Sequence, residues 1–172
     1  MSFDQITGWK GLRVLALVGA AFLVTACQVR PLYDTDGVTA THLASIEFSD
    51  ANTRVGQVVR NRLIFLTSGG AGEPDKADYA VTMNVVSSTS KVLLIHSSDT
   101  ARAAQVTVSA TYRLVRNSDQ QVLKSGNRSA TSLVDLSIQE FANVRAVRDA
   151  EDRAGRELAE LIRADLASTL SR

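Results

Sequence analysis

The chain has 172 residues and a formal net charge of +1 at pH 7. This length suits one domain, with or without a processed leader, and the apolar (45%) and charged (22%) shares are ordinary for a globular protein. The charged residues of the first 26 positions are Asp4, Lys10 and Arg13, so the rest of the chain is neutral overall. Nucleic-acid binding needs a basic surface that displaces counterions, and this neutral balance argues against it.

The N-terminal segment has the pattern of a bacterial lipoprotein signal. Two basic residues precede the thirteen uncharged residues 14–26. This run is shorter than the roughly 20 residues of a membrane-spanning helix, but it is typical of a signal-peptide core. The small residues Thr25 and Ala26 precede Cys27, and Val-Thr-Ala-Cys resembles a lipobox. We expect cleavage between Ala26 and Cys27, although an ordinary signal peptide with a chance cysteine, or a short buried helix, would also fit the pattern.

Lipid attachment at Cys27 explains why the chain has a single cysteine. A lone cysteine in a secreted domain forms no internal disulfide, whereas several acyl chains, at about 0.8 kcal/mol per buried CH₂, give a stable membrane anchor. Gln28 follows, and in sorting rules resembling those of enteric bacteria a residue other than Asp favours the outer membrane. We therefore expect a signal peptide over 1–26, a lipidated tether over 27–41, and one periplasmic domain over 42–172.

The first half of this domain is predicted to contain a strand, a helix and a loop. Alternating apolar residues over 42–48 predict a half-buried strand. Helix-starting residues and an apolar repeat at helical spacing then predict a helix over about 53–67. The segment 67–78 is rich in Gly and contains Pro74, which predicts a surface loop. It lacks the Lys-Ser/Thr of a phosphate-binding P-loop.

The second half is predicted to contain three strands, the last two of which form a hairpin. Residues 79–85 alternate, and the serine-rich segment Ser87–Ser90 predicts an interruption before the apolar run 92–95. The clearest period of two in the chain covers 104–114. The polar sequence RNSDQQ then predicts a tight turn into a further strand over 122–134.

A long amphipathic helix is predicted to end the chain. Ser137 and Glu140 have the spacing of a capping box, with Leu136 and Phe141 placed as the hydrophobic staple around it. Two adjacent rows of alternating charge predict a solvated face: Arg145, Asp149, Arg153 and Glu157, and Arg148, Asp152, Arg156 and Glu160. The packing side carries apolar residues, namely Val144, Val147, Ala150, Ala154, Leu158, Leu161 and Ile162.

The order β-α-β-β-β-α predicts an α+β fold. Each strand has one apolar face and one face rich in Ser and Thr, and two helices can cover only one side of such a sheet. We expect a two-layer sandwich, with a four-stranded mixed sheet and both helices on one face. The first β-α-β unit should cross over right-handed if its strands are parallel.

The chemistry-bearing residues do not suggest catalysis or a cofactor. His42 and His96 lie in separate segments without ligand partners at metal-binding spacing, and no nucleophile-elbow, Rossmann or Walker pattern is present. We therefore expect no enzyme activity, no cofactor and no metal. Scattered cations lie in or beside the strands, where they favour solubility and edge protection or contact anionic lipid phosphates: Lys91, Arg102, Arg113, Lys124 and Arg128.

Two segments resemble one family, the lipopolysaccharide-assembly lipoproteins LptE. The sequence RPLY over 30–33, shortly after Cys27, is similar to the start of alphaproteobacterial members. The sequence FANVRAVRDAEDRAGRELAELIRADLASTL over 141–170 resembles their final helix, and the order of elements agrees.

The resemblance implies an outer-membrane lipoprotein that binds and plugs the LptD β-barrel, helps it fold, and contacts lipopolysaccharide. The nearest competing function is that of an auxiliary lipoprotein in a phospholipid-trafficking ABC system, which has a similar size and order of elements. A lipid-tethered periplasmic hydrolase and a purely structural envelope lipoprotein are also compatible with the sequence.

Overall fold

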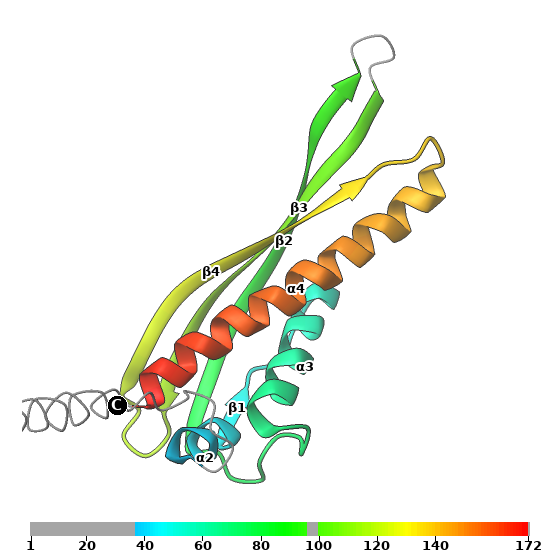
Figure 1. Ribbon diagram of the computed structural model, residues 1–172. Helices are drawn as coiled ribbons and strands as arrows, with labels where there is room; N and C mark the ends of the chain where they lie inside the picture. The colour runs from blue at the N-terminus through cyan, green and yellow to red at the C-terminus, as the bar shows by residue number, and fades with distance from the viewer. Residues whose placement is uncertain (1–36, 96–99, 172) are drawn as a thin grey trace, which may run out of the picture. The chain divides into compact units, whose positions relative to one another are not determined.

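The computed structural model describes residues 37–95 and 100–171 (Figure 1). Contacts divide the chain into Met1–Pro31 and Leu32–Arg172, and all described residues belong to the second unit. The elements are α2 (Val38–Ala44), β1 (Ile46–Phe48), α3 (Arg54–Ser68), β2 (Tyr79–Ile95), β3 (Thr100–Arg116), β4 (Val122–Asp135) and α4 (Glu140–Leu170).

The strands form one four-stranded mixed sheet in the order β1-β2-β3-β4. β1 and β2 are parallel and connected through α3, whereas β2, β3 and β4 are antiparallel neighbours joined by hairpins. The β2–β3 register runs from Tyr79 opposite Arg116 to Ile95 opposite Thr100. The predicted α+β class and mixed four-stranded sheet are confirmed, and the described residues contain three helices where two were expected.

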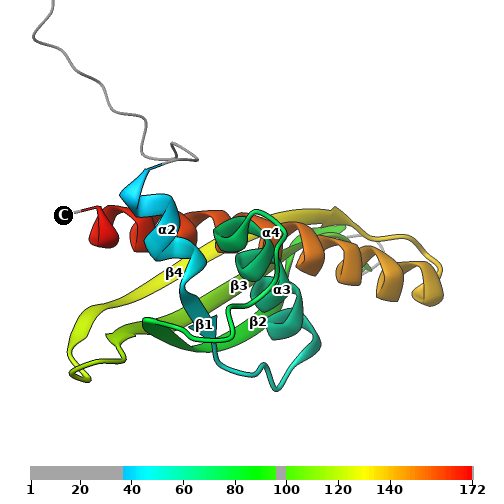
Figure 2. The ribbon, with the colours of Figure 1, turned by 90° about the horizontal axis from the view of Figure 1, so that it is seen from below.

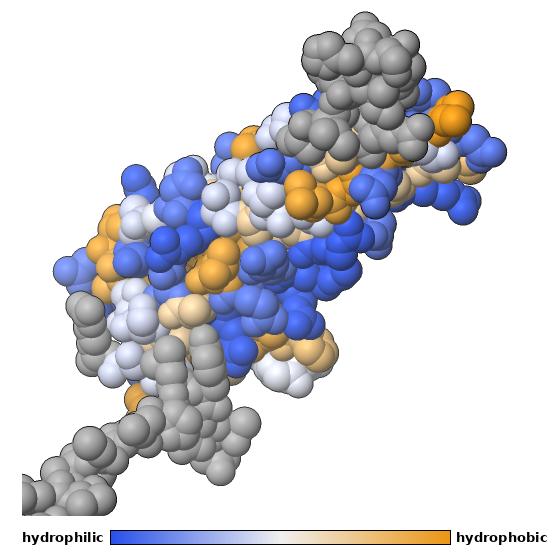
Figure 3. Space-filling view, turned by 45° about the horizontal axis from the view of Figure 1, so that its top comes forward, coloured by the Kyte–Doolittle hydropathy of each residue, from blue (hydrophilic) through white to orange (hydrophobic). Residues whose placement is uncertain are grey.

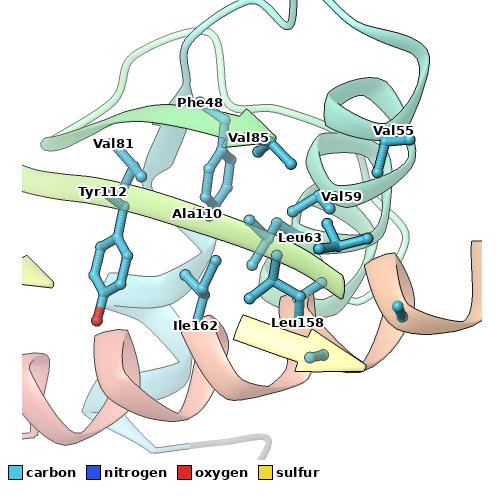
Figure 4. Close-up of a cluster of buried hydrophobic side chains, with 14 of the residues drawn as sticks. Phe48, Val55, Val59, Leu63, Val81, Val85, Ala110, Tyr112, Leu158 and Ile162 are labelled. Carbon is cyan, nitrogen blue, oxygen red and sulfur yellow. The ribbon is translucent and has the colours of Figure 1, made fainter. Parts of the chain in front are cut away.

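The core lies between the sheet and its helices, which cover one face (Figure 2). Even-numbered β3 residues point into this layer and are at most 2% exposed: Ala104, Val106, Val108, Ala110, Tyr112 and Leu114. Opposite them, Val59 and Leu63 of α3 meet Leu158 and Ile162 of α4, all four fully buried (Figure 4). Burying each such side chain stabilises the fold by about 1.5–3 kcal/mol.

The predicted strand over 42–48 is wrong in its first half. Residues up to Ala44 belong to α2, and the strand is confined to Ile46–Phe48. Leu43 is 3% exposed and belongs to the core, and α2 contacts both α3 and α4. Tertiary burial therefore overrides the local alternation. The predicted helix over 53–67 is confirmed as α3. Thr53 caps its start by accepting a hydrogen bond from the backbone N–H of Gly56 (3.0 Å).

The predicted interruption at Ser87–Ser90 is also wrong, because β2 continues through it. These residues pair with β3 in regular register, Ser87 opposite Val108 and Ser90 opposite Gln105. Strand pairing uses backbone groups that every residue carries, so small polar side chains on exposed strand positions do not end the ladder. The register shifts occur later, between Lys91 and Leu94.

The start of α4 differs from the predicted capping box. The helix begins at Glu140, and Ser137 lies before it, bonded through its backbone to the side-chain amide of Asn143 (2.7 and 2.9 Å). The side chain of Asn143 therefore bonds the backbone just before α4, a role that the predicted capping box gave to Glu140. Phe141 is 74% exposed, so the predicted staple with Leu136 is wrong as well.

One of the two predicted charge rows on α4 faces α3 and is not simply solvated. Arg54 donates to Asp152 (2.6 Å) and Glu151 (2.5 Å), and these bonds raise the pKa of the guanidinium. Arg62 donates to Glu160 (2.7 Å). Acidic residues on this side of α4 therefore form ion pairs with α3, in addition to the apolar contact between the two helices.

Candidate binding surfaces

The structure distributes four of the five predicted cations over two faces and both ends of the sheet. Lys91, Lys124 and Arg128 occupy strand positions on the helix side, opposite inward-facing β3 residues, whereas Arg113 lies on the outer side. The side chain of Arg102 falls outside the described residues. These cations therefore do not form one cluster.

Distances along the strands keep Lys91 and Arg113 apart. Arg113 pairs with Thr82, and Lys91 lies nine positions further along β2. At about 3.3 Å per residue this separation is roughly 30 Å. One phosphate group cannot contact both side chains, although a large amphiphile with several phosphates could.

Arg128 is already bound to a carboxylate of α4. Its Nε and Nη2 donate to the two oxygens of Asp165 (2.7 and 2.8 Å), and the Tyr112 hydroxyl donates to the same carboxylate (2.5 Å). The hydrogen bonds from Arg128, and then from Tyr112, lower the pKa of Asp165. Burial and the bond to Asp165 raise the pKa of Tyr112. This cluster ties β3, β4 and α4 together.

The outer face of the sheet is polar, and none of the described helices covers it (Figure 2). Neighbouring strands exchange weak side-chain bonds there, between Thr107 and Thr131 (3.3 Å) and from Asn127 to Thr111 (3.4 Å). A depression of about 560 Å³ lies around Arg113, and its outer-face lining is Thr82, Asn84, Thr111, Arg113 and Ser125. The face offers hydroxyls, amides and one guanidinium to a polar partner.

An exposed apolar corner lies where β4 ends and α4 begins. Leu133 is 67% exposed, Ile138 91%, Phe141 74% and Val144 51%. Figure 3 shows hydrophobic residues at this end of α4 on a surface that is otherwise mostly polar. Arg145 lies over the Phe141 ring, 5.2 Å from its centroid. Exposed apolar clusters of this kind mark contact sites.

Sequence reasoning missed the apolar corner because it assigned Phe141 to a staple and Val144 to the packing side. The available signal was the density of large apolar residues in the short connection after β4, where Leu136, Ile138 and Phe141 lie within six positions. A connection that only joins a strand to a helix does not require large apolar side chains.

Residues 37–95 and 100–171 provide neither a metal cluster nor a membrane-spanning helix. This part of the chain contains no group of three or more His, Cys, Asp or Glu side chains arranged to hold a metal ion. None of its helices combines the length and apolarity needed to cross a bilayer. Ala26 and Cys27, the predicted cleavage and lipidation positions, lie outside the described residues.

The sheet and its helices have the fold of several bacterial lipoproteins. A putative lipoprotein from Caulobacter crescentus is 21% identical, with a TM-score of 0.62 over 77% of this chain and 96% of that one. Rare lipoprotein B from Shewanella oneidensis is 14% identical, with a TM-score of 0.56 over 73% and 93%. Lipoprotein B from Nitrosomonas europaea is 16% identical, with a TM-score of 0.55 over 73% and 82%. At these identities the likeness establishes the fold alone, and no curated protein sequence matches significantly.

The family is established by sequence. The model of the lipopolysaccharide-assembly family LptE matches residues 40–166, well over half of the chain. The chain belongs to this family, and the resemblance drawn from its two ends is confirmed. The matched region contains all four strands and the two long helices almost completely, so it is the α+β unit itself that defines membership.

Proposed function

We propose that this chain is a lipid-anchored outer-membrane lipoprotein that binds inside the LptD β-barrel and assists lipopolysaccharide assembly at the cell surface. The observation that carries the proposal is the family match over 40–166, which spans the sheet and both long helices. It is a binding and assembly role, and it requires surfaces more than a catalytic centre.

The anchor is assigned to Cys27, after cleavage behind Ala26. Eleven positions separate Cys27 from Val38, the first residue of α2. At 3.3–3.6 Å per residue this segment reaches at most about 40 Å. That reach keeps the domain close to the membrane in which the barrel sits.

The polar outer face supports a place inside a barrel. The lumen of a wide outer-membrane barrel is polar and lined by water, so a protein within it needs hydrophilic surfaces. The outer face supplies Ser, Thr and Asn side chains together with Arg113. Lys91, Arg113 and Lys124 have no carboxylate within salt-bridge distance in the described part of the chain, and with Arg102 they are the candidate phosphate contacts. Arg128 is engaged by Asp165.

Depletion of the chain is the primary test. Loss of the mature barrel and of surface lipopolysaccharide, restored by re-expression, supports the proposal. Unchanged surface lipopolysaccharide after depletion contradicts it. A pull-down with the tagged chain separates the main competing function, because an inner-membrane transporter with its substrate-binding partner, recovered in place of a barrel, indicates phospholipid trafficking.

A charge reversal tests the phosphate contact separately. Arg113→Glu should weaken lipopolysaccharide binding by the purified chain, because it places a carboxylate against an anionic ligand. Arg156→Glu is the matched control, since Arg156 is exposed on α4, away from the outer face. Equal binding by both variants removes Arg113 from the site without touching the barrel assignment.

A further inference from the structure

The two edges of the sheet differ, and the β1 edge is closed. The backbone N–H of Phe48 donates to Glu73 Oε1 (3.0 Å), and the Phe48 carbonyl accepts from Arg60 Nε (3.3 Å). Arg60 and Glu73 bond to each other at 2.7 Å, which fixes the pair. A three-residue strand whose Phe48 N–H and C=O are already bonded resists the addition of another strand.

The β4 edge is long, and its odd-numbered residues turn their backbone groups outward. The backbone N–H of Asn117 donates to the carbonyl of Asp78, just before β2, so odd-numbered β3 residues bond toward β2. The backbone N–H of Arg116 donates to the carbonyl of Gln121, just before β4. Even-numbered β3 residues therefore bond toward β4, and the register places Ala110 opposite Arg128. The β4 residues that direct N–H and C=O away from the sheet are Ser125, Asn127, Ser129, Thr131 and Leu133.

Only the Leu133 end of this edge is covered by a described residue. Arg153 of α4 donates to the Leu133 carbonyl and to Ser132 Oγ, both at 3.1 Å. Within residues 37–95 and 100–171, no hydrogen bond reaches the outward backbone groups between Ser125 and Thr131. The register is regular from Lys124 onward, and β4 is the outermost strand on its side of the sheet (Figure 1). A neighbouring strand would find four residues with unbonded N–H and C=O groups.

Cations that form no salt bridge flank this segment on both faces. Lys124 lies on the helix face, and Arg113 lies opposite Ser125 on the outer face. Neither is within salt-bridge distance of a carboxylate in the described part of the chain, although the charge of Lys124 also acts on Asp165, which is paired with Arg128. A second copy of this chain would bring the same cations to the same edge. An acidic segment of another protein complements the edge better.

We propose that the β4 edge, from Ser125 to Thr131, binds an extended acidic segment of the β-barrel partner, which pairs with it as a fifth strand. The inference rests on the proposed function, because the barrel is the partner assigned there. In strand addition the main-chain hydrogen bonds supply affinity, and alternate side chains supply specificity. Aspartate or glutamate residues of the segment lie near Lys124 and Arg113.

A proline on the outward side of β4 tests the pairing. Asn127→Pro removes an outward N–H but no ladder bond to β3, a position where edge strands tolerate proline. Asn127→Ala is the matched control, because it removes the side chain and keeps the N–H. The tagged, lipidated full-length chain is extracted in mild detergent from the cells that produce it, and the co-purified barrel is quantified. Thermal unfolding verifies the fold, and Ser129→Pro is the second variant.

The expected result is a loss of about tenfold or more in barrel recovery for the proline variant, with Asn127→Ala near wild type. Lys124→Glu should also reduce recovery. Equal recovery by a folded Asn127→Pro or Ser129→Pro overturns the edge proposal and leaves the proposed function intact. A wild-type chain that recovers no barrel overturns both. A homodimer that the proline abolishes, seen by sedimentation, overturns the barrel segment as the occupant.

Photo-crosslinking locates the segment directly. A photoreactive residue at position 129 should crosslink to an acidic stretch of the barrel, identified by mass spectrometry of the crosslinked peptides. The same residue at position 156, on the exposed side of α4, is the control. Crosslinks from position 129 only to lipopolysaccharide, or only to a neutral or basic stretch, contradict the proposed pairing.

Discussion

Gly126→Ala, which adds one methyl group, should destabilise the protein. The same change at Gly155 should stabilise it. Gly126 lies opposite Tyr112, and a Cβ at this position would be 2.6 Å from the Tyr112 hydroxyl oxygen and 2.7 Å from Cζ. The ring would have to move away from Asp165, to which its hydroxyl donates at 2.5 Å. Gly126 is therefore required by the close approach of a side chain that secures α4.

The magnitude follows from three contributions to the free energy of unfolding. Alanine is intrinsically better than glycine inside a strand by about 0.5–1 kcal/mol. Overpacking a well-filled site costs about 1–3 kcal/mol. Losing a hydrogen bond to a charged group costs about 1.5–3 kcal/mol. For Gly126→Ala the last two outweigh the first, and we expect a net loss of about 1.5–5.5 kcal/mol.

Gly155→Ala is the matched control, because it adds the same methyl group inside a helix. There the new Cβ would lie 3.4 Å from Val58 and 3.5 Å from Val59, which is ordinary contact. The intrinsic gain of about 0.5–1 kcal/mol should then appear in full. Urea unfolding followed by circular dichroism measures both variants against wild type. The reasoning is refuted if Gly126→Ala is as stable as wild type, or if the two variants shift in the same direction.

Three further predictions address the ion cluster, the core and the anchor. The lowered pKa of Asp165 means that its ionised form contributes stability above about pH 4, which is lost as the pH falls through the folded-state pKa. The stability difference between wild type and Asp165→Asn, measured by urea unfolding at pH 7 and pH 3, should therefore narrow at low pH; an unchanged difference contradicts the assignment. Leu158→Asp buries an unpaired charge at a fully buried position and should cost more than about 4 kcal/mol, whereas Leu161→Asp, at a site 39% exposed on the same helix, should cost less than about 1 kcal/mol. Equal melting temperatures for the two would mean that the wrong face of α4 has been assigned to the core. Cys27→Ala should leave the chain unprocessed at the lipoprotein site and mostly absent from washed membranes; tight retention of a processed product, detected by mass spectrometry, argues against the lipid anchor.

The sheet and the long helices could be predicted because their signals are local. The alternation over 104–114 reports which side of β3 is buried, and the polar residues Ser49, Asp50 and Asn52 predicted a helix start close to the observed cap, Thr53. α2 could not be predicted in this way, since a seven-residue helix is marginal by itself. It depends on Leu43 joining a core to which α3 and α4 contribute, and the residues of α4 lie about a hundred positions or more away.

The roles of the cations could not be predicted for a related reason. Whether a strand residue faces the helices or the outer side depends on the register, which the turn and the shift near Leu114 set together. Only that register brings Arg128 over Asp165 and sends Arg113 to the opposite face. The sequence names the charged residues, but their partners belong to elements far along the chain.

Net neutrality does not exclude the proposed anion contact, because the ion pairs of this fold are unevenly placed. Arg54, Arg62 and Arg128 neutralise carboxylates of α4 within the helix layer. Among the described strand positions of the outer face, Arg113 is the one cation, and the acidic residues Glu47 and Asp135 lie toward its ends. A carboxylate that is paired with an arginine in the helix layer does not compete with a phosphate for Arg113. A chain too neutral to attract a nucleic acid can therefore still present the Arg113 guanidinium among hydroxyls, with the two carboxylates of this face placed toward its ends.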